Sequence, residues 1–233
     1  LYVPVGQPGN NVLNDDEHGL IRRMNLDGSG DEVIARGVRN TVGFDWHPQT
    51  RQLYFTDNGR DWMSEDVPED ELNRVTRVGE HFGAPFCLQG NIADPEFGWG
   101  KSCSEFTAPV GLLGPHSAAL GMRFYTGSMF PRAYRNVAVI ARHGSWNRSN
   151  KVGGDLVIAK ADPARAEPGE VVEVAFRVDR GPGLPERPVR GEGGVVTLGA
   201  RARSVATLGV GHRNAQRKMT SGAWSAVRQN ETT

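Results

Sequence analysis

The sequence of 233 residues has little that would direct it to a membrane or to a polyanion. None of its apolar runs approaches the roughly 18 residues that a membrane-spanning helix needs, and no basic segment followed by an apolar one stands at its start. Basic and acidic residues balance at 27 each, so bulk charge implies neither a nucleic-acid partner nor an acidic surface as partner.

Apolar stripes at helical spacing are also scarce, whereas residues that form turns are abundant. The sequence contains 30 glycines and 14 prolines. This composition favours an all-β fold with many turns over a helical one. The length suffices for one large domain with a substantial core, or for two small ones.

Cysteine is nearly absent, with only Cys87 and Cys103 in the chain. Both lie in a stretch rich in glycine and proline that is typical of a long loop. A disulfide between them would contribute about 3 kcal/mol and would indicate an oxidising compartment. Two unpaired buried thiols are the alternative interpretation, and the spacing alone leaves both open.

Short alternating segments, each preceded by a turn and followed by a polar loop, predict strands at residues 1–6, 53–57 and 137–141. The first two begin 52 residues apart. A repeat of roughly 40–50 residues that carries several strands is typical of β-propeller blades. Further strands are expected at residues 33–35, 155–159 and 171–176, and residues 69–78 read as either a short helix or an extended insertion.

Both ends of the sequence are unusual for a complete domain. The sequence begins inside an apolar strand without an initiator Met, which we interpret as truncation, because a domain rarely starts with an unpaired core strand. We expect a partial propeller over residues 1–176. Residues 177–233 are rich in Arg and Gly and atypical; they read either as a disordered tail or as the product of a reading-frame error in a GC-rich gene.

Chemistry concentrates between residues 39 and 85. Arg39 and Asn40 precede a strand, and an Arg fork with an Asn amide suits a ligand that carries carboxylates, although an isolated pair is more often a hairpin surface. Gly59 follows a strand and can aim carbonyls inward, where Ca²⁺ accepts them as ligands. The acidic run at residues 69–73 would on its own be a solvated surface or a helix start.

The order of these blocks resembles the soluble quinoprotein glucose/sorbosone dehydrogenase family, and looks closest to its sorbosone-dehydrogenase-like branch. The resemblance covers residues 1–176. Further matching blocks follow in register at residues 81–85 (HFGAP), 114–122 (GPHSAALGM), 124–125 (FY), 130–135 (FPRAYR) and 142–148 (RHGSWNR).

The resemblance implies a six-bladed β-propeller with the quinone over its central channel, here a partial propeller of about three to four blades. It implies pyrroloquinoline quinone and Ca²⁺ as cofactors, and oxidation of a sugar by hydride transfer to the quinone. An external electron acceptor, a quinone or a cytochrome, would complete the cycle. It also implies a periplasmic or secreted protein.

The resemblance assigns site residues only where this sequence matches. Arg39 and Asn40 match the pair at the polar edge of the quinone, and Arg142 stands where relatives place a Lys or Arg on its carboxylates. The catalytic His is expected before Leu1, outside this sequence. Gln7 stands where relatives carry an Asp, which puts the orientation of that His in doubt.

The same comparison assigns metal ligands. The carbonyls of Gly59 and Arg60 match ligands of the cofactor's Ca²⁺. Glu71, the carbonyl of Phe82 and Asp94 match parts of a second, structural calcium site.

Three rival interpretations remain at this point. The first is a non-catalytic, calcium-stabilised propeller that binds proteins or glycans, in which the quinone-contacting arginines would be dispensable. The second is a propeller lactonase, whose central ion would need side-chain ligands from several blades rather than carbonyls. The third is a chain of about half a propeller that folds poorly, because its sheet edges are open.

Overall fold

A computed structural model of the chain describes residues 1–13, 15–160 and 171–174. It divides into two compact units, Leu1–Val171 and Val172–Thr233. The predicted tail at residues 177–233 lies outside the described residues. In the part that is described, the chain is all-β apart from two short 3₁₀ helices, and none of its helices is long and apolar enough to cross a membrane.

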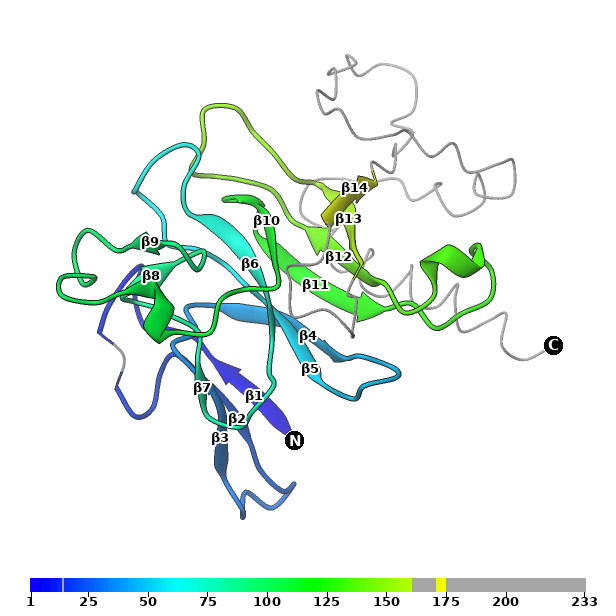
Figure 1. The fold of residues 1–233 in the computed structure, drawn as a ribbon, viewed down its shortest axis with the longest axis horizontal. Coiled ribbons are helices and arrows are strands. Elements are labelled where there is room, and N and C mark those ends of the chain that lie inside the picture. The colour runs from blue at the N-terminus through cyan, green and yellow to red at the C-terminus, as the bar shows by residue number, and fades with distance from the viewer. Residues whose placement is uncertain (14, 161–170, 175–233) are drawn as a thin grey trace. The chain divides into compact units, whose positions relative to one another are not determined.

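The first sheet has the strand order β1-β2-β3-β7 (Figure 1). Strands β1 to β3 pair antiparallel as a meander, and β7 joins β3 in parallel. Their bounds are Tyr2–Val5, Leu20–Arg23, Glu32–Arg36 and Glu80–His81.

The second sheet has the order β10-β6-β5-β4, and all its pairings are antiparallel. Its strands are Thr41–Trp46 (β4), Leu53–Asp57 (β5), Glu69–Arg74 (β6) and Gly111–Pro115 (β10). The acidic run that was open between a helix and an extended segment is therefore strand β6. The helical interpretation was wrong, because this run lies inside a sheet, between β5 and β10.

The third sheet has the order β11-β12-β13-β14. Its strands are Ala119–Phe124, Ala138–Arg142, Asp155–Ala159 and Val171–Val174. The remaining elements are β8 (Cys87–Leu88), β9 (Ile92–Ala93), η1 (Cys103–Glu105) and η2 (Arg132–Tyr134). The predicted strands are thus confirmed, with residues 175–176 outside the described part.

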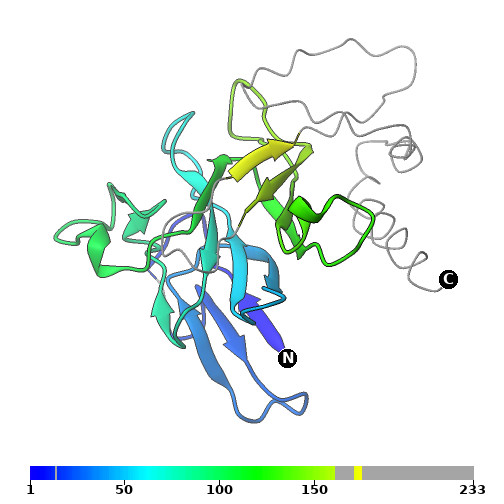
Figure 2. The ribbon, with the colours of Figure 1, turned by 45° about the vertical axis from the view of Figure 1, so that its right-hand side comes forward.

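Strand β5 lies between two hydrophobic cores, which is why all five of its residues are buried. Tyr54 packs with the apolar side chains of β11, β12 and β13. Leu53 and Phe55 point to the other face and pack with those of the first sheet. Because neighbouring residues of a strand point to opposite faces, one strand joins successive sheets, as in the stacked blades seen in Figure 2.

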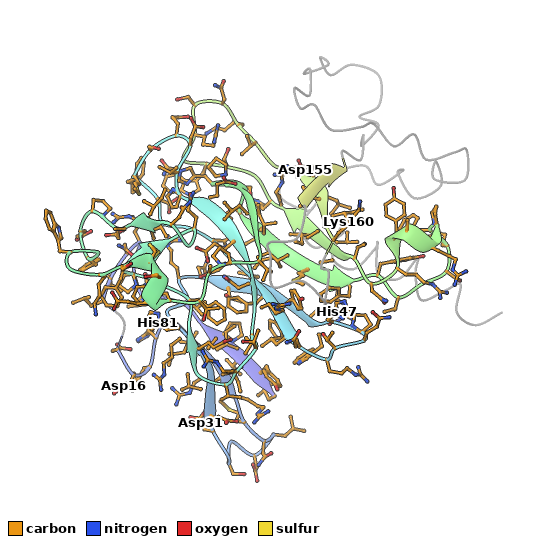
Figure 3. The ribbon with its side chains drawn as sticks, viewed as in Figure 1. Asp16, Asp31, His47, His81, Asp155 and Lys160 are labelled. Atoms are coloured by element: carbon orange, nitrogen blue, oxygen red, sulfur yellow. A yellow bond between two sulfur atoms is a disulfide. The ribbon has the colours of Figure 1, made fainter. Side chains whose placement is uncertain are left out.

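Two positions show how closely the second and third sheets approach. A Cβ on Gly43 of β4 would lie 3.0 Å from both the Leu120 carbonyl oxygen and the Met122 nitrogen of β11, so only glycine fits this crossing. The side chain of His47, in the turn after β4, is fully buried (Figure 3). Its ring packs edge-on against Phe124.

The two cysteines form a disulfide, Cys87–Cys103, with their Cα atoms 5.4 Å apart. The alternative of two free thiols was therefore wrong. The bond closes the loop that holds the β8–β9 hairpin. This loop connects β7 of the first sheet to β10 of the second. The 52-residue spacing joined β1 and β5, which are not equivalent strands: β1 lies at the edge of the first sheet, whereas β5, like β12, lies inside its sheet.

Candidate active site

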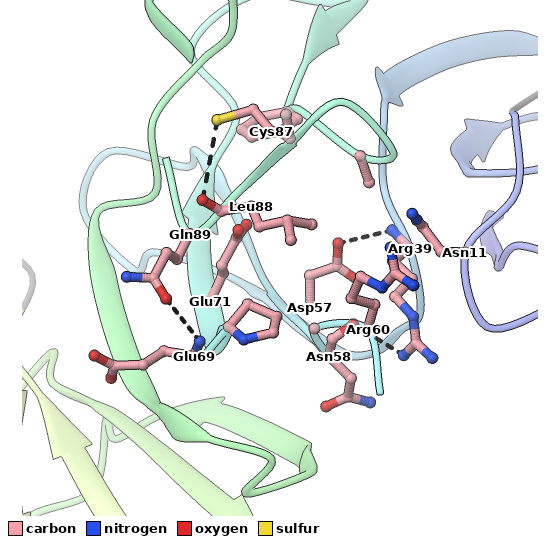
Figure 4. Close-up of a pocket in the computed structure, with 14 residues that line it drawn as sticks. Asn11, Arg39, Asp57, Asn58, Arg60, Glu69, Glu71, Cys87, Leu88 and Gln89 are labelled. Atoms are coloured by element: carbon pink, nitrogen blue, oxygen red, sulfur yellow. Dashed lines mark hydrogen bonds between the residues drawn. The ribbon is translucent and has the colours of Figure 1, made fainter. Parts of the chain in front are cut away.

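A small cavity of about 10 Å³ lies where the loop after β3, the strands β5 and β6 and the loop that follows β7 meet (Figure 4). That volume is close to what one water-sized group or ion requires. Five of the eight residues that the sequence predicted as site residues line it: Arg39, Gly59, Arg60, Glu71 and Phe82. The other three, Asn40, Asp94 and Arg142, lie outside its lining.

Two buried carboxylates face this cavity from neighbouring strands. Asp57 at the end of β5 is the register partner of Glu71 on β6, so both side chains project from the same face of the sheet. Burial raises the pKa of Glu71 to about 8, and repulsion from Asp57 adds to this shift. Burial also raises the pKa of Asp57 to about 6. Attraction from Arg39 opposes the shift of Asp57 but does not cancel it, so the ionised form of the pair stays disfavoured.

Asp57 also holds the backbone of the predicted quinone-contacting pair. Its two carboxylate oxygens accept the N–H groups of Arg39 at 2.8 Å and of Asn40 at 2.6 Å. The sequence interpretation gave Asp57 no role. The available signal was an Asp that ends a buried strand immediately before Asn58 and Gly59, where an apolar residue would otherwise be expected.

Asp70 holds the next loop in a similar way. Its carboxylate accepts the N–H of Gly59 at 2.9 Å, the N–H of Ala118 at 2.7 Å and the hydroxyl of Ser117 at 3.0 Å. Burial raises its pKa. The acidic run is therefore not the solvated surface that it would most often be in isolation, because Asp70 and Glu71 are both buried.

The turn after β5 exposes backbone oxygens beside the two carboxylates. A Cβ on Gly59 would lie 2.9 Å from Cγ of Pro68, so glycine is required by close approach rather than by a positive φ. In residues 1–13 and 15–160, no hydrogen bond reaches the carbonyl oxygens of Gly59, Arg60 or Phe82. These oxygens thus remain available as ligands.

The donor set suits a hard cation. Ca²⁺ takes six to eight oxygen ligands, including carboxylates and backbone carbonyls. Across the described residues, no group of three or more His, Cys, Asp or Glu side chains could hold a metal by itself. A cation here would therefore combine the carboxylate of Glu71 or Asp57 with carbonyls, and its charge would relieve the repulsion between the two buried acids.

Arg39 is partly committed to its own loop. Its guanidinium donates to the carbonyl oxygen of Asn10 at 2.6 Å, to the side chain of Asn10 at 2.9 Å, and to the Asn58 carbonyl at 3.2 Å. It also pairs with Asp61 at 3.4 Å. A guanidinium has five N–H donors, and partners among the described residues take four of those of Arg39, which leaves one for a ligand. The neighbouring Asn40 side chain is exposed.

Arg142 and Asp94 are each held by several partners, those of Arg142 outside the cavity. Arg142 forms a two-pronged ion pair with Asp155, at 2.8 and 2.6 Å, and also donates to the Leu113 carbonyl at 3.1 Å. Asp94 accepts from Arg60 at 2.8 Å and from Asn11 at 3.0 Å. Its other oxygen accepts two backbone N–H groups. Asp94 is therefore connected to the cavity through two lining residues, Arg60 and Asn11.

Comparison with known proteins defines the class. Residues 14–144 match the family model described as "Glucose / Sorbosone dehydrogenase", which is more than half of the chain. The chain belongs to this family. An uncharacterized protein of Borreliella burgdorferi is 39% identical over 164 residues, which cover 70% of this chain and 43% of that protein.

Solved structures support the fold. A Trichoderma reesei carbohydrate-active enzyme of family AA12, in a calcium structure, matches with a TM-score of 0.59 and 20% identity, covering 69% of this chain and 50% of that one. The PQQ domain of a Coprinopsis cinerea pyranose dehydrogenase, in its holo form, matches with a TM-score of 0.58 and 20% identity, covering 73% and 51%. At these identities the likeness establishes the fold alone, and the chain spans about half the length of the proteins it matches.

Proposed function

We propose that the chain is part of a pyrroloquinoline-quinone-dependent dehydrogenase of the sorbosone-like kind, which oxidises a sugar with the help of Ca²⁺. The observation that carries this proposal is the facing pair Asp57 and Glu71 beside unpaired carbonyls, in a chain of the glucose/sorbosone dehydrogenase family. Two buried carboxyl groups side by side destabilise a sheet. A pair of apolar residues at these two positions would be more stable, so the carboxyl groups indicate a function such as cation binding.

The proposed metal ligands lie in the loop after β5, in strand β6 and in the loop after β7. The carbonyls of Gly59 and Arg60 would hold the ion associated with the cofactor. Glu71 and the Phe82 carbonyl would hold a second, structural ion, as the raised pKa of Glu71 and its position in the cavity lining support. Asp94 enters this proposal through its lining partners: it orients Arg60 by an ion pair and accepts from Asn11.

The quinone carboxylates would be held by Arg39, Asn40 and Arg142. Asp57 fixes the backbone of the first two, and the one remaining donor of Arg39 and the exposed Asn40 amide are the groups that would bind the ligand. For Arg142 the ion pair with Asp155 orients the guanidinium, and a quinone carboxylate would have to share it. An Arg suits this role because its planar fork matches a carboxylate.

Bound quinone and Ca²⁺ would supply a hydride acceptor and the Lewis acid that polarises it. The proton of the sugar hydroxyl would pass to a His that we place before Leu1, and an external quinone or cytochrome would reoxidise the cofactor. The disulfide supports a periplasmic or secreted location, because such bonds persist in oxidising compartments.

The experiment is a titration of the purified chain with pyrroloquinoline quinone, with and without Ca²⁺. We expect calcium-dependent binding that weakens in Arg39→Ala and Asn40→Ala, with Arg123→Ala, an exposed arginine on β11, as the control. A folded chain that binds Ca²⁺ but no quinone would contradict the cofactor assignment. That result would favour the non-catalytic, calcium-stabilised binding module.

A further inference from the structure

Two exposed tryptophans from different sheets contact each other. The side chain of Trp62, in the loop between β5 and β6, is 70% exposed, and that of Trp146, in the loop between β12 and β13, is 61% exposed. Their ring centroids lie 5.0 Å apart, with the ring planes at 80°. Figure 1 shows these two loops side by side, in cyan and yellow-green. A large exposed aromatic surface of this kind often marks a binding site.

The backbone at Trp62 is held in a costly conformation. Its φ is 64°, in the left-handed region that bulky residues rarely adopt. Glycine or asparagine would occupy this position without the same steric cost. Strain that is kept at an exposed residue indicates a function for the side chain, because stability alone would favour another residue.

The two loops are tied together beside the tryptophans. Ser149 donates its backbone N–H and its hydroxyl to the Glu65 carboxylate, both at 2.9 Å. Arg148 pairs with Asp66 at 3.1 Å. These contacts tie the two loops together, and the rings meet edge to face. They also place polar groups of both charge signs next to the tryptophans in sequence: Glu65, Asp66, Arg148 and Ser149.

The two tryptophan loops also carry, or contact, residues of the proposed cofactor site. Asp61, which precedes Trp62, pairs with Arg39, and Trp146 follows Arg142 by four positions. Short stretches of chain therefore connect the tryptophan pair to these residues, although neither tryptophan lines the cavity itself.

We propose that Trp62 and Trp146 form a stacking surface for a pyranose ring, a proposal that rests on the proposed sugar-dehydrogenase function. A pyranose has apolar C–H faces that pack on an indole and a girdle of hydroxyls that suits the surrounding Glu65, Asp66 and Ser149. Two cations stand among these carboxylates: Arg148 pairs with Asp66, and Lys151 donates to the Trp146 carbonyl at 2.8 Å. The surface therefore carries both signs of charge, which suits an uncharged polyhydroxy ligand.

The test uses the full chain with Ca²⁺ and no quinone, titrated with glucose and with cellobiose. Binding is followed by tryptophan fluorescence and by saturation-transfer NMR. We expect binding to weaken about fivefold to tenfold in Trp62→Ala and in Trp146→Ala, the loss of one aromatic contact, and to be partly retained in Trp62→Phe. Trp99→Ala is the matched control, because Trp99 is 84% exposed but lies within the disulfide loop.

The strained backbone adds an independent readout. Trp62→Gly relieves the left-handed strain, so it should melt at no lower temperature than the parent chain while losing saccharide binding as Trp62→Ala does. A structural role for Trp62 predicts the reverse, a lower melting temperature and unchanged binding. Absence of saccharide binding by the folded parent chain would overturn the proposal, and so would unchanged binding in both alanine variants.

Quinone titration of the same variants separates this proposal from the one it rests on. Trp62→Ala and Trp146→Ala should keep the quinone affinity of the parent chain. If the parent binds saccharide through the tryptophans but binds no quinone, the stacking surface stands and the cofactor assignment falls. If it binds quinone but no saccharide, the stacking surface falls alone.

Discussion

Asp57 and Glu71 lie directly opposite each other on β5 and β6, and both side chains are buried. Like charges in this arrangement destabilise an antiparallel pair, and burial deepens the cost because it removes the water that would screen them. The raised pKa values of both groups express this cost. In our account a Ca²⁺ ion bound beside Glu71 offsets this cost, so the stability of the chain depends on calcium.

Glu71→Gln replaces a buried carboxyl group, whose pKa burial raises to about 8, with a neutral amide of nearly the same shape. The amide oxygen can still accept the bond that Asn73 now donates to Glu71 at 2.9 Å. We expect the calcium-free variant to be more stable than the calcium-free parent by about 1–3 kcal/mol, and its melting temperature to be insensitive to Ca²⁺. The parent should gain about 2.7 kcal/mol at a calcium concentration of 100 Kd. Thermal melts in EDTA and in Ca²⁺ measure both; Glu17→Gln, at an exposed position, should behave like the parent.

Asp57→Asn should have the opposite effect on the calcium-free chain. The carboxylate of Asp57 accepts two backbone N–H groups, whereas an amide offers one oxygen and turns its own N–H groups toward the second donor. The buried donor left unpaired costs about 1–3 kcal/mol. Urea unfolding should show a lower midpoint, and the Arg39 loop should bind quinone more weakly. A variant as stable as the parent would show that Asp57 does not organise this loop.

Reduction of the disulfide should loosen the wall of the cavity. Cys87 and its neighbours Leu88 and Gln89 line the cavity, and the bond closes a loop of 16 residues in sequence separation, for which about 3 kcal/mol of stabilisation is expected. Urea unfolding with and without reductant measures this difference. In the double variant Cys87→Ala, Cys103→Ser, the reductant should have no effect on the midpoint; a shift there would have another origin than the disulfide.

His47 should make the chain less stable at acidic pH. Burial lowers the pKa of its imidazole, so the folded chain keeps the ring neutral where the unfolded chain, with a pKa near 6.5, takes up a proton. This contribution is fully present above about pH 6.5 and is lost as the pH falls through the lowered pKa, by at most about 1.4 kcal/mol per pH unit. The parent's unfolding free energy should therefore fall more steeply below pH 6.5 than that of His47→Gln. Parallel curves would contradict the assignment.

The sequence was sufficient for the fold class because the strand signals are local. Alternation and turn residues located β5 and β12, and the order of short motifs located the region of the cavity. The helical reading of residues 69–78 failed because acidic residues have low strand propensity in general, while here tertiary pairing of β6 with β5 and β10 decides.

The roles of Asp57 and Asp70 could not be predicted from their neighbours in the sequence. Asp57 acts on backbone groups 17 and 18 positions away, and Asp70 acts on Ala118, 48 positions away. Such contacts arise only when the sheets are assembled. The contact between Trp62 and Trp146 is of the same kind, since it joins loops from two different sheets.

Direct calorimetric titration of the calcium-free chain with Ca²⁺ tests the central claim, that the cavity between Asp57 and Glu71 holds a cation. We expect saturable binding in the parent chain and in the surface control Glu17→Gln, and its loss or a strong weakening in Glu71→Gln. Binding that is unchanged in Glu71→Gln, or no binding by a chain that is folded, would contradict the account.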